Sequence, residues 1–231
     1  MKILFRSHID YLCNRTNLLI LSFVLLLSFF GFSEASLALD KNELPILNNR
    51  YFFENSFFIL KLLSVFAATF TFSYAFTQKS DQYGELLLVR GISRSFYFYS
   101  KVLVIALYLA YFLVLEFALY LFCGAIFLKQ FYPPGLLSLF RLLLLNLYYG
   151  LISLAFMQFL RNLYIVIIPF FMFIVGMILN ENEGKLQFYY NMFFPNFLSE
   201  KPELFHGDLH ILTMLTVIIL INQLLYLSRD L

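Results

Sequence analysis

The chain has 231 residues, of which 61% are hydrophobic and 13% are charged, and its formal net charge is +2 at pH 7. A soluble domain carries roughly 25% charged residues, so this composition excludes an ordinary soluble domain and predicts an integral membrane protein. At about 20 residues per membrane-spanning helix, the length allows five or six spans and no sizeable soluble domain, so we expect residues 1–231 to form a single transmembrane domain. The basic residues form no continuous patch, and a nucleic-acid partner is therefore not expected.

The segment MKILFRSHIDYLCNRTN at residues 1–17 predicts a short amphipathic helix. Phe5, Ile9 and Leu12 follow one another at i, i+4 and i+7 and would share one face of a helix. Basic residues surround this face, which is typical of a helix that lies on the inner leaflet of a membrane. A disordered basic tail is the alternative interpretation.

Long apolar runs bounded by polar clusters predict membrane-spanning helices. The runs lack the period-2 alternation of a barrel strand, and in lipid the backbone can otherwise be satisfied only within a helix. We therefore predict an all-α integral membrane protein with six transmembrane helices, at residues 18–33, 57–76, 102–128, 136–159, 164–180 and 209–227. The first run has no small-residue cleavage motif and is expected to stay as a span.

The basic residues of the connecting segments predict the orientation. One side of the membrane would carry Lys2, Arg6, Arg15, Lys79, Arg90, Arg94, Lys101, Arg161 and Arg229. The other side would carry only Lys41, Arg50, Lys129, Lys185 and Lys201. Because Lys and Arg favour the cytoplasmic side, both termini are expected in the cytoplasm, with the chain in the inner (cytoplasmic) membrane.

A dense polar segment, TQKSDQYGELLLVRGISRSFYFYSK, joins the second and third predicted spans at residues 77–101, and we call it the elbow. Residues 81–90 could form a brief helix that ends at Gly91, and Ser93 or Ser95 could cap the helix that follows. A simple connection between two spans needs only a handful of residues. The extra length indicates a cytoplasmic docking surface.

Motifs for chemistry are absent from the sequence. There is no phosphate-binding loop of the Gly-x-x-x-x-Gly-Lys-Ser/Thr type and no Gly-x-Ser-x-Gly nucleophile turn. Cys13 and Cys123 would lie at different depths, and no ligand-like neighbours accompany them. His206 and His210 are spaced at i,i+4, but Gly207 lies between them and no third ligand is near in sequence. We therefore expect neither a metal site nor an enzyme.

At the elbow the sequence resembles the first cytoplasmic loop of ABC-2 type permeases, the membrane subunits of one class of ATP-binding cassette transporters. That loop typically reads Glu, two or three leucines, a short gap, Pro-x-Ser-Arg and a Lys seven residues after the Arg. The matching residues here are Glu85, Leu86, Leu87, Ser93, Arg94 and Lys101. Gly91 stands where the family usually has proline, and Gly84 directly precedes the glutamate instead of lying three residues before it.

The likeness extends over essentially the whole chain, through the six spans and the amphipathic first segment. The stretch KLQFYYNMFFPNFL at 185–198 resembles the re-entrant or interfacial helices that such permeases carry before their last span. An aromatic belt segment with no fold of its own is the alternative for this stretch.

The resemblance implies a permease that exports a hydrophobic or amphipathic cargo. Peptide or drug-like cargo is the first expectation, and a glycan or lipid is the second. The permease would pair with a second identical or related copy, and two copies of an ABC ATPase subunit would supply ATP and Mg, so this chain would bind no cofactor itself. The elbow residues expected to contact or anchor the ATPase are Asp81, Glu85, Arg90, Ser93, Arg94 and Lys101. An ordinary solvated loop is the alternative for them.

Three residues of the types Asp, Glu, Lys and Arg lie within the predicted spans. Glu116 would lie near the bilayer centre and should face the bundle or a dimer interface, because a charge facing lipid there is costly. Lys61 and Arg141 lie nearer the outer ends and could extend outward to water, although Arg141 could instead pair with Glu116. Such sparse ionisable groups disfavour an intramembrane enzyme. A stand-alone membrane protein, such as an immunity-type protector or a small channel, remains the alternative function.

Overall fold

The computed structural model describes residues 2–37, 45–77, 92–128, 136–160, 162–180, 185–195 and 205–228. Within these ranges the secondary structure is helical and there is no strand, which confirms the all-α prediction. The helices are α1 (Lys2–Leu12), α2 (Arg15–Leu37), α3 (Pro45–Ala75), α5 (Arg94–Leu128), α6 (Leu136–Leu160), the 3₁₀ turn η1 (Leu163–Val166), α7 (Ile167–Asn180), α8 (Lys185–Phe193) and α9 (Phe205–Leu227).

Among the described residues, five helices are long and apolar enough to cross a membrane, namely those over Arg15–Ser36, Arg50–Ala75, Arg94–Leu128, Ser138–Leu160 and Leu209–Leu227. This architecture is compatible with a multi-pass membrane protein.

The sixth predicted span, 164–180, is not confirmed at full length. It consists of the 3₁₀ turn η1 and the 14-residue helix α7. At about 1.5 Å per residue α7 is roughly 21 Å long, which is shorter than the hydrocarbon core of about 30 Å. Pro169 lies in the first turn of α7. Because proline has no N–H to donate, it is tolerated near the start of an α-helix, which suits a helix that begins only two residues earlier.

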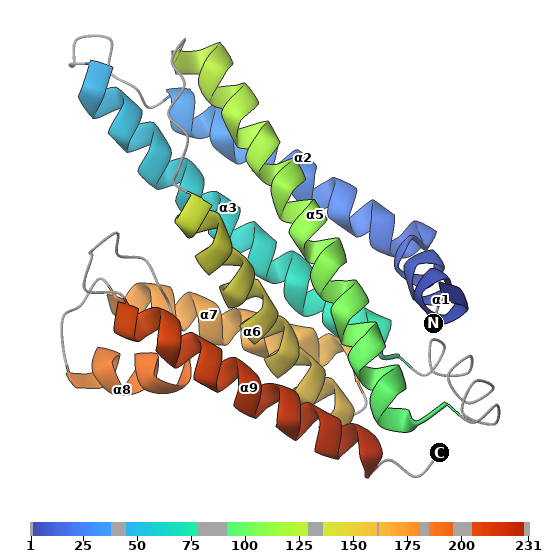
Figure 1. Ribbon diagram of the computed structural model, residues 1–231. Helices are drawn as coiled ribbons and strands as arrows, with labels where there is room; N and C mark the ends of the chain where they lie inside the picture. The colour runs from blue at the N-terminus through green and yellow to red at the C-terminus, as the bar shows by residue number, and fades with distance from the viewer. Residues whose placement is uncertain are drawn as a thin grey trace.

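Helix α3 lies at the centre of the bundle (Figure 1). It packs against α2 and α5 on one side and against α6 and α7 on the other, and α6 in turn packs against α9. The most apolar window of α3 and that of α6 are each 61% buried, whereas that of α9 is 22% buried. Helices α3 and α6 therefore form the core, and the other long helices surround it.

Small residues allow α3 and α6 to approach closely. A Cβ atom added at Gly150 of α6 would lie 2.2 Å from the Cδ2 atom of Phe72, so the Phe72 ring occupies the space that the missing side chain leaves. Nearby, the Oγ atoms of Ser73 and Ser153 are 2.7 Å apart and form a buried hydrogen bond. Close backbone approach and interhelical hydrogen bonds of this kind stabilise helix pairs in membranes.

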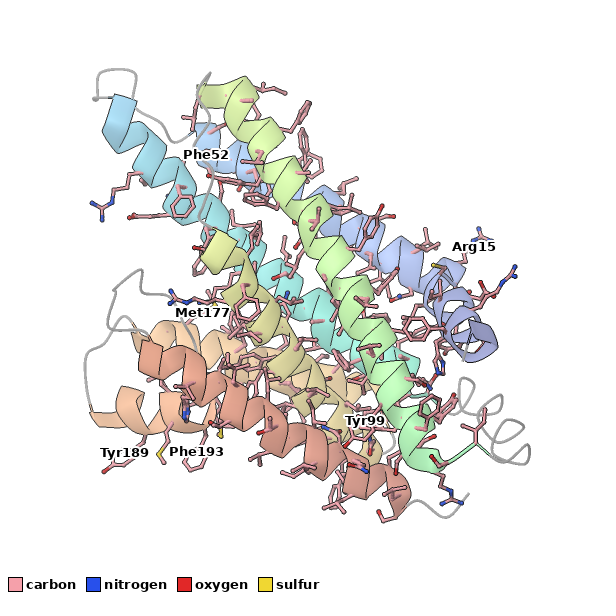
Figure 2. The ribbon with its side chains drawn as sticks, viewed as in Figure 1. Arg15, Phe52, Tyr99, Met177, Tyr189 and Phe193 are labelled. Carbon is pink, nitrogen blue, oxygen red and sulfur yellow. The ribbon has the colours of Figure 1, made fainter. Side chains whose placement is uncertain are left out.

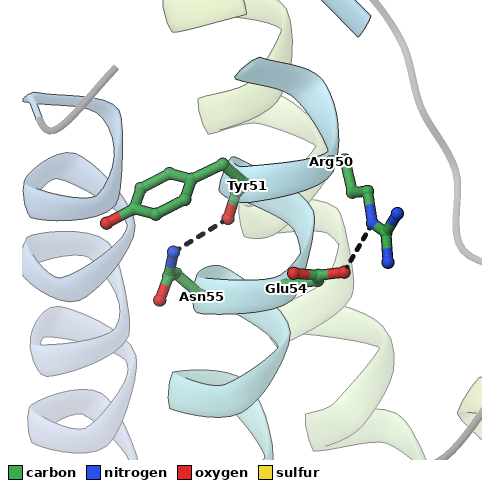
Figure 3. Close-up of polar contacts among 4 residues, drawn as sticks. All are labelled: Arg50, Tyr51, Glu54 and Asn55. Carbon is green, nitrogen blue, oxygen red and sulfur yellow. Dashed lines mark hydrogen bonds and ion pairs between the residues drawn. The ribbon is translucent and has the colours of Figure 1, made fainter. Parts of the chain in front are cut away.

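Helix α3 begins well before the predicted span at 57–76. Its first turns contain an exposed ion pair in which Arg50 Nε donates to Glu54 Oε1 at 2.8 Å, and the amide of Asn55 donates to the Tyr51 carbonyl (Figure 3). Phe52, which is labelled in Figure 2, is 1% exposed, and its ring stacks on that of Tyr120 of α5. The span predicted from hydropathy leaves out these polar residues. The helix nevertheless includes them, because the i,i+4 ion pair and the buried aromatic face stabilise its first turns.

Helix α1 confirms the helix predicted at the N-terminal segment, but the predicted face is corrected at one position. Leu12 is buried and Phe5 packs against the core, although this face was expected to lie on the membrane, and Ile9 is 45% exposed. His8 takes its place with 5% exposure. Residues 5, 8 and 12 are spaced at i, i+3 and i+7, which is an equally good helical stripe.

Candidate functional site

The elbow is described only at its two ends. Residues 78–91 lie outside the described ranges, and with them the predicted contact residues Asp81, Glu85 and Arg90. Thr77 follows α3 on one side, and Ser93 precedes α5 on the other. Ser93 Oγ accepts a hydrogen bond from the Phe96 N–H at 3.3 Å, which confirms the predicted helix cap.

Five side chains from four parts of the chain pack together where the elbow joins the bundle. Each is at most 5% exposed, and we call them the basal cluster: His8 of α1, Phe76 after α3, Tyr97 and Lys101 of α5, and Tyr226 of α9. Lys101 was predicted as an elbow anchor, and the structure places it inside this cluster. Arg94, the first residue of α5, is half-buried.

Aromatic rings surround the ammonium group of Lys101. Its Nζ atom lies 4.4 Å from the ring centroid of Phe76 and 5.3 Å from that of Tyr97. The ring of Tyr226 stacks on Tyr97 at 6.3 Å and meets Phe76 edge-on at 6.1 Å. The negative faces of aromatic rings attract a cation, so the cluster holds a buried positive charge among rings of three separate segments.

His8 joins α1 to this cluster. Its ring meets Tyr97 edge-to-face at 5.0 Å, and its Nε2 atom lies 3.2 Å from Ser100 Oγ. The Ser100 hydroxyl donates to the Tyr97 carbonyl at 2.8 Å, so we assign the proton of the His8–Ser100 bond to His8 Nε2. Burial, followed by the nearby charge of Lys101, lowers the pKa of His8 to about 4. His8 is therefore a neutral hydrogen-bond donor at neutral pH.

Two further sets of contacts connect the helices that flank the elbow. The Tyr11 hydroxyl of α1 lies 3.1 Å from Thr77 Oγ1, and the rings of Tyr11 and Tyr74 stack at 5.7 Å. On the opposite flank, Gln223 of α9 accepts a hydrogen bond from the Tyr99 hydroxyl and donates to Ser95 Oγ at 3.3 Å. The two ends of the elbow are thus tied to α1 and α9 as well as to α3 and α5.

Glu116 faces the bundle, as predicted. It is completely buried, and its Oε1 atom accepts a hydrogen bond from Ser28 Oγ of α2 at 3.1 Å. Its Oε2 atom has no hydrogen-bond partner in the described structure. The suggested pairing with Arg141 is therefore wrong, because the carboxylate contacts α2 and Arg141 lies half-buried on α6.

Lys61 does not extend to the surface, and this expectation is also wrong. The side chain is 1% exposed, and its Nζ atom lies 5.6 Å from the ring centroid of Phe173 of α7. Because α3 begins at Pro45, Lys61 lies roughly 24 Å from the start of the helix at about 1.5 Å per residue. Its four-carbon stem therefore ends among the helices.

Sequence reasoning missed the buried amides and the aromatic partners of Lys101. Asn222 Nδ2 donates to the Leu151 carbonyl of α6 at 2.9 Å, and Gln158 Nε2 donates to Asn222 Oδ1 at 3.4 Å. The sequence did contain a signal for these amides, because Asn222 and Gln158 lie inside apolar runs. Amide side chains in such positions commonly join helices in membranes. His8 also had a signal, because it shares a helical face with Phe5 and Leu12.

The contacts at the two ends of the elbow connect α1, α3, α5 and α9. Both cysteines are free, and the described residues include no group of three or more His, Cys, Asp or Glu side chains that could hold a metal ion. No protein-family model matches the chain, and no curated protein matches it. The functional argument therefore rests on the sequence and on the geometry at the elbow.

Proposed function

We propose that this chain is the permease subunit of an ATP-driven ABC exporter and that the elbow at 77–101 is the docking site for a separate ATPase subunit. The proposal rests on one observation: the side chains at both ends of the elbow make contacts that join α1, α3, α5 and α9. Close-packed side chains transmit a displacement because they have little free volume to absorb it. A push on residues 78–91 would thus reach four helices together.

The placement of the chain ends supports the proposed topology. Figure 1 shows both termini at the end of the bundle where α3 ends and α5 begins, which is the end that carries the elbow. The excess of Lys and Arg in these segments favours the cytoplasmic side. In this proposal η1 and α7 provide the sixth crossing, and local thinning of the bilayer accommodates the short helix.

The partner subunits follow from the same proposal. The sequence has no phosphate-binding loop, so ATP and Mg would be bound by two ATPase copies, and a second permease copy, identical or related, would complete the transport path. The cargo would be hydrophobic or amphipathic, with a peptide or drug-like molecule ahead of a glycan or lipid.

Co-purification tests the proposal. The tagged chain, extracted from its native membrane in mild detergent, should bring with it an ATPase that contains a phosphate-binding loop. The complex should hydrolyse ATP, and the isolated chain should not. A stand-alone protector or channel would bring no such ATPase, and turnover of ATP by the isolated chain would refute the proposal.

Two variants test the role of the elbow. Replacing Glu85 and Arg90 together by alanine should greatly reduce ATPase recovery. The matched control is Glu54→Ala, because Glu54 is an exposed acid in the part of α3 that lies away from the elbow, and its loss should cost at most about 0.5 kcal/mol. Normal ATPase recovery with the double variant would show that the elbow is an ordinary loop.

A further inference from the structure

The hydrogen bond between Glu116 of α5 and Ser28 of α2 lies deep in the bundle. Both side chains are completely buried, and Ser28 Oγ donates to Glu116 Oε1 at 3.1 Å. At about 1.5 Å per residue, Glu116 lies roughly 18 Å from the end of α5 at Leu128 and roughly 33 Å from its start at Arg94. The carboxyl group is therefore far from both ends of the helix.

Apolar side chains enclose this bond along both helices. On α2, Val24 and Phe32 lie one turn on either side of the serine, and on α5, Phe112 and Tyr120 lie one turn on either side of the glutamate. These four side chains are at most 4% exposed. The rings of Phe32 and Tyr120 meet edge-on with centroids 5.9 Å apart, and Val24 and Phe112 belong to one hydrophobic cluster. The bond therefore lies between two apolar layers that separate it from water.

No cation neutralises Glu116 within the part of the chain that the structure describes. There, no Lys, Arg or His side chain forms an ion pair or a hydrogen bond with it. Lys61 of α3 lies beside a ring of α7, and Arg141 of α6 is half-buried. The ionisable residues of α2, Arg15 and Glu34, are exposed. Helices α1 and α9 contact α5 at the basal cluster, which is about four turns of α5 away.

The second carboxyl oxygen of Glu116, Oε2, is buried and has no hydrogen-bond partner in the described structure. If the group were ionised, this oxygen would share a negative charge with neither a donor nor a counter-ion beside it, which is expensive in an apolar site. If Oε2 carries a proton, the cost is only that of one unpaired neutral hydroxyl. The packing between α2 and α5 therefore favours the neutral acid.

We propose that Glu116 is a proton-binding site and that its proton resides on Oε2 in the packed bundle. The proton comes from water and converts the carboxylate into a carboxylic acid. Its release returns it to water, so water must reach Oε2, and the two apolar layers prevent this until α2 and α5 separate. The bound proton thus stabilises the contact between α2 and α5. This role is independent of the proposed ATPase partner.

Infrared spectroscopy of the full chain in lipid vesicles at neutral pH tests the charge state. A carboxylic acid has a carbonyl stretching band that a carboxylate lacks, and subtracting the spectrum of Glu116→Gln removes the bands of lipid esters and of other acids. We expect the native chain to show the acid band and Glu116→Gln to lose it. Glu54→Gln is the matched control and should keep the band, because Glu54 is an exposed acid paired with Arg50. A carboxylate band in the difference spectrum would overturn the proposal.

Ser28→Ala keeps the test decisive if Glu116→Gln does not fold. This variant retains the acid but removes the hydroxyl that donates to Oε1. The acid band should therefore persist and move to higher frequency, because a hydrogen bond to a carbonyl oxygen lowers its stretching frequency. An unmoved band would assign it to another group and would contradict the proposal.

Transfer to heavy water tests the enclosure of the site. The acid band shifts when deuterium replaces the proton, and this shift should be slow, because exchange requires a local opening of α2 from α5. Phe32→Ala removes one apolar layer and should accelerate the shift by at least about tenfold. Phe23→Ala is the control, because Phe23 of the same helix is 58% exposed, and it should leave the rate unchanged. Equal exchange rates in the two variants would overturn the enclosed site.

Discussion

His8 is a neutral, buried imidazole, and its state predicts a pH dependence of stability. Burial and Lys101 lower its pKa from the usual 6.5 to about 4, so the unfolded chain binds the proton more readily than the folded chain. The stabilisation is complete above pH 6.5 and is lost as the pH falls toward 4. Between about pH 7 and about pH 5 the loss should be at most about 2 kcal/mol. Melting temperatures in detergent at the two pH values would measure it.

The comparison variant is His8→Gln, whose side-chain amide can still donate to Ser100 but does not titrate. Its stability should change less between the two pH values than that of the native chain. His206 and His210 are present in both proteins, so the difference reports His8 alone. Equal pH dependence of the two proteins would contradict the assignment of His8 as a buried neutral donor.

At the scale of elements, the contact between α3 and α6 depends on the absence of a side chain at Gly150. A Cβ there would meet the Phe72 ring at 2.2 Å, and Phe72 is completely buried and cannot move aside freely. Gly150→Ala should therefore destabilise the bundle by about 1 to 3 kcal/mol, the usual cost of overpacking. Thermal or denaturant unfolding in detergent would measure the loss.

Gly124 of α5 provides a matched control, because it is also a buried helical glycine. The nearest atom to an added Cβ is Phe52 Cε1 at 3.7 Å, which is an ordinary contact. Gly124→Ala should be neutral or stabilising by up to about 1 kcal/mol, since alanine favours a helix more than glycine does. If both substitutions had the same effect, the close approach of α3 and α6 would not depend on Gly150.

At the scale of the whole molecule, the arrangement predicts that the chain crosses the membrane an even number of times. Both termini lie at one end of the bundle, and the start of α3 lies at the other (Figure 1). Cys13 and Ser228 are exposed near the two termini, and Arg50 is exposed near the start of α3. In intact cells a membrane-impermeant thiol reagent should label Arg50→Cys, and it should reach Cys13 and Ser228→Cys only after permeabilisation.

Each cysteine is tested in a chain that carries Cys123→Ser and, for the introduced positions, Cys13→Ser. Labelling of Ser228→Cys in intact cells while Cys13 stays protected would place the termini on opposite sides. It would also mean that α7 does not cross the membrane, and the six-crossing topology would then be wrong.

Local hydropathy was sufficient to predict the helices, because an apolar run in lipid can satisfy its backbone only within a helix. It predicted the extent of the long helices less well, and it started α3 at residue 57, which is after Arg50 and Phe52, although the helix begins at Pro45. There the helix continues through an i,i+4 ion pair and an aromatic contact with another helix, and neither contributes to hydropathy. Hydropathy also predicted one full-length span at 164–180, where the structure has η1 and the short helix α7. The reason is that this stretch is apolar throughout, so its hydropathy does not mark where the α-helix begins.

By itself, then, the sequence determined the all-α class, the positions of five long apolar helices, the amphipathic first helix and the cap at Ser93. Only the tertiary structure decided the partners of the charged residues. Lys101 lies against the rings of Phe76 and Tyr97, Glu116 bonds to Ser28 in place of Arg141, and Lys61 is buried beside Phe173. These contacts join residues that are far apart in the chain, and the depth and neighbours of a side chain depend on which helices pack together, which no local pattern of residues records.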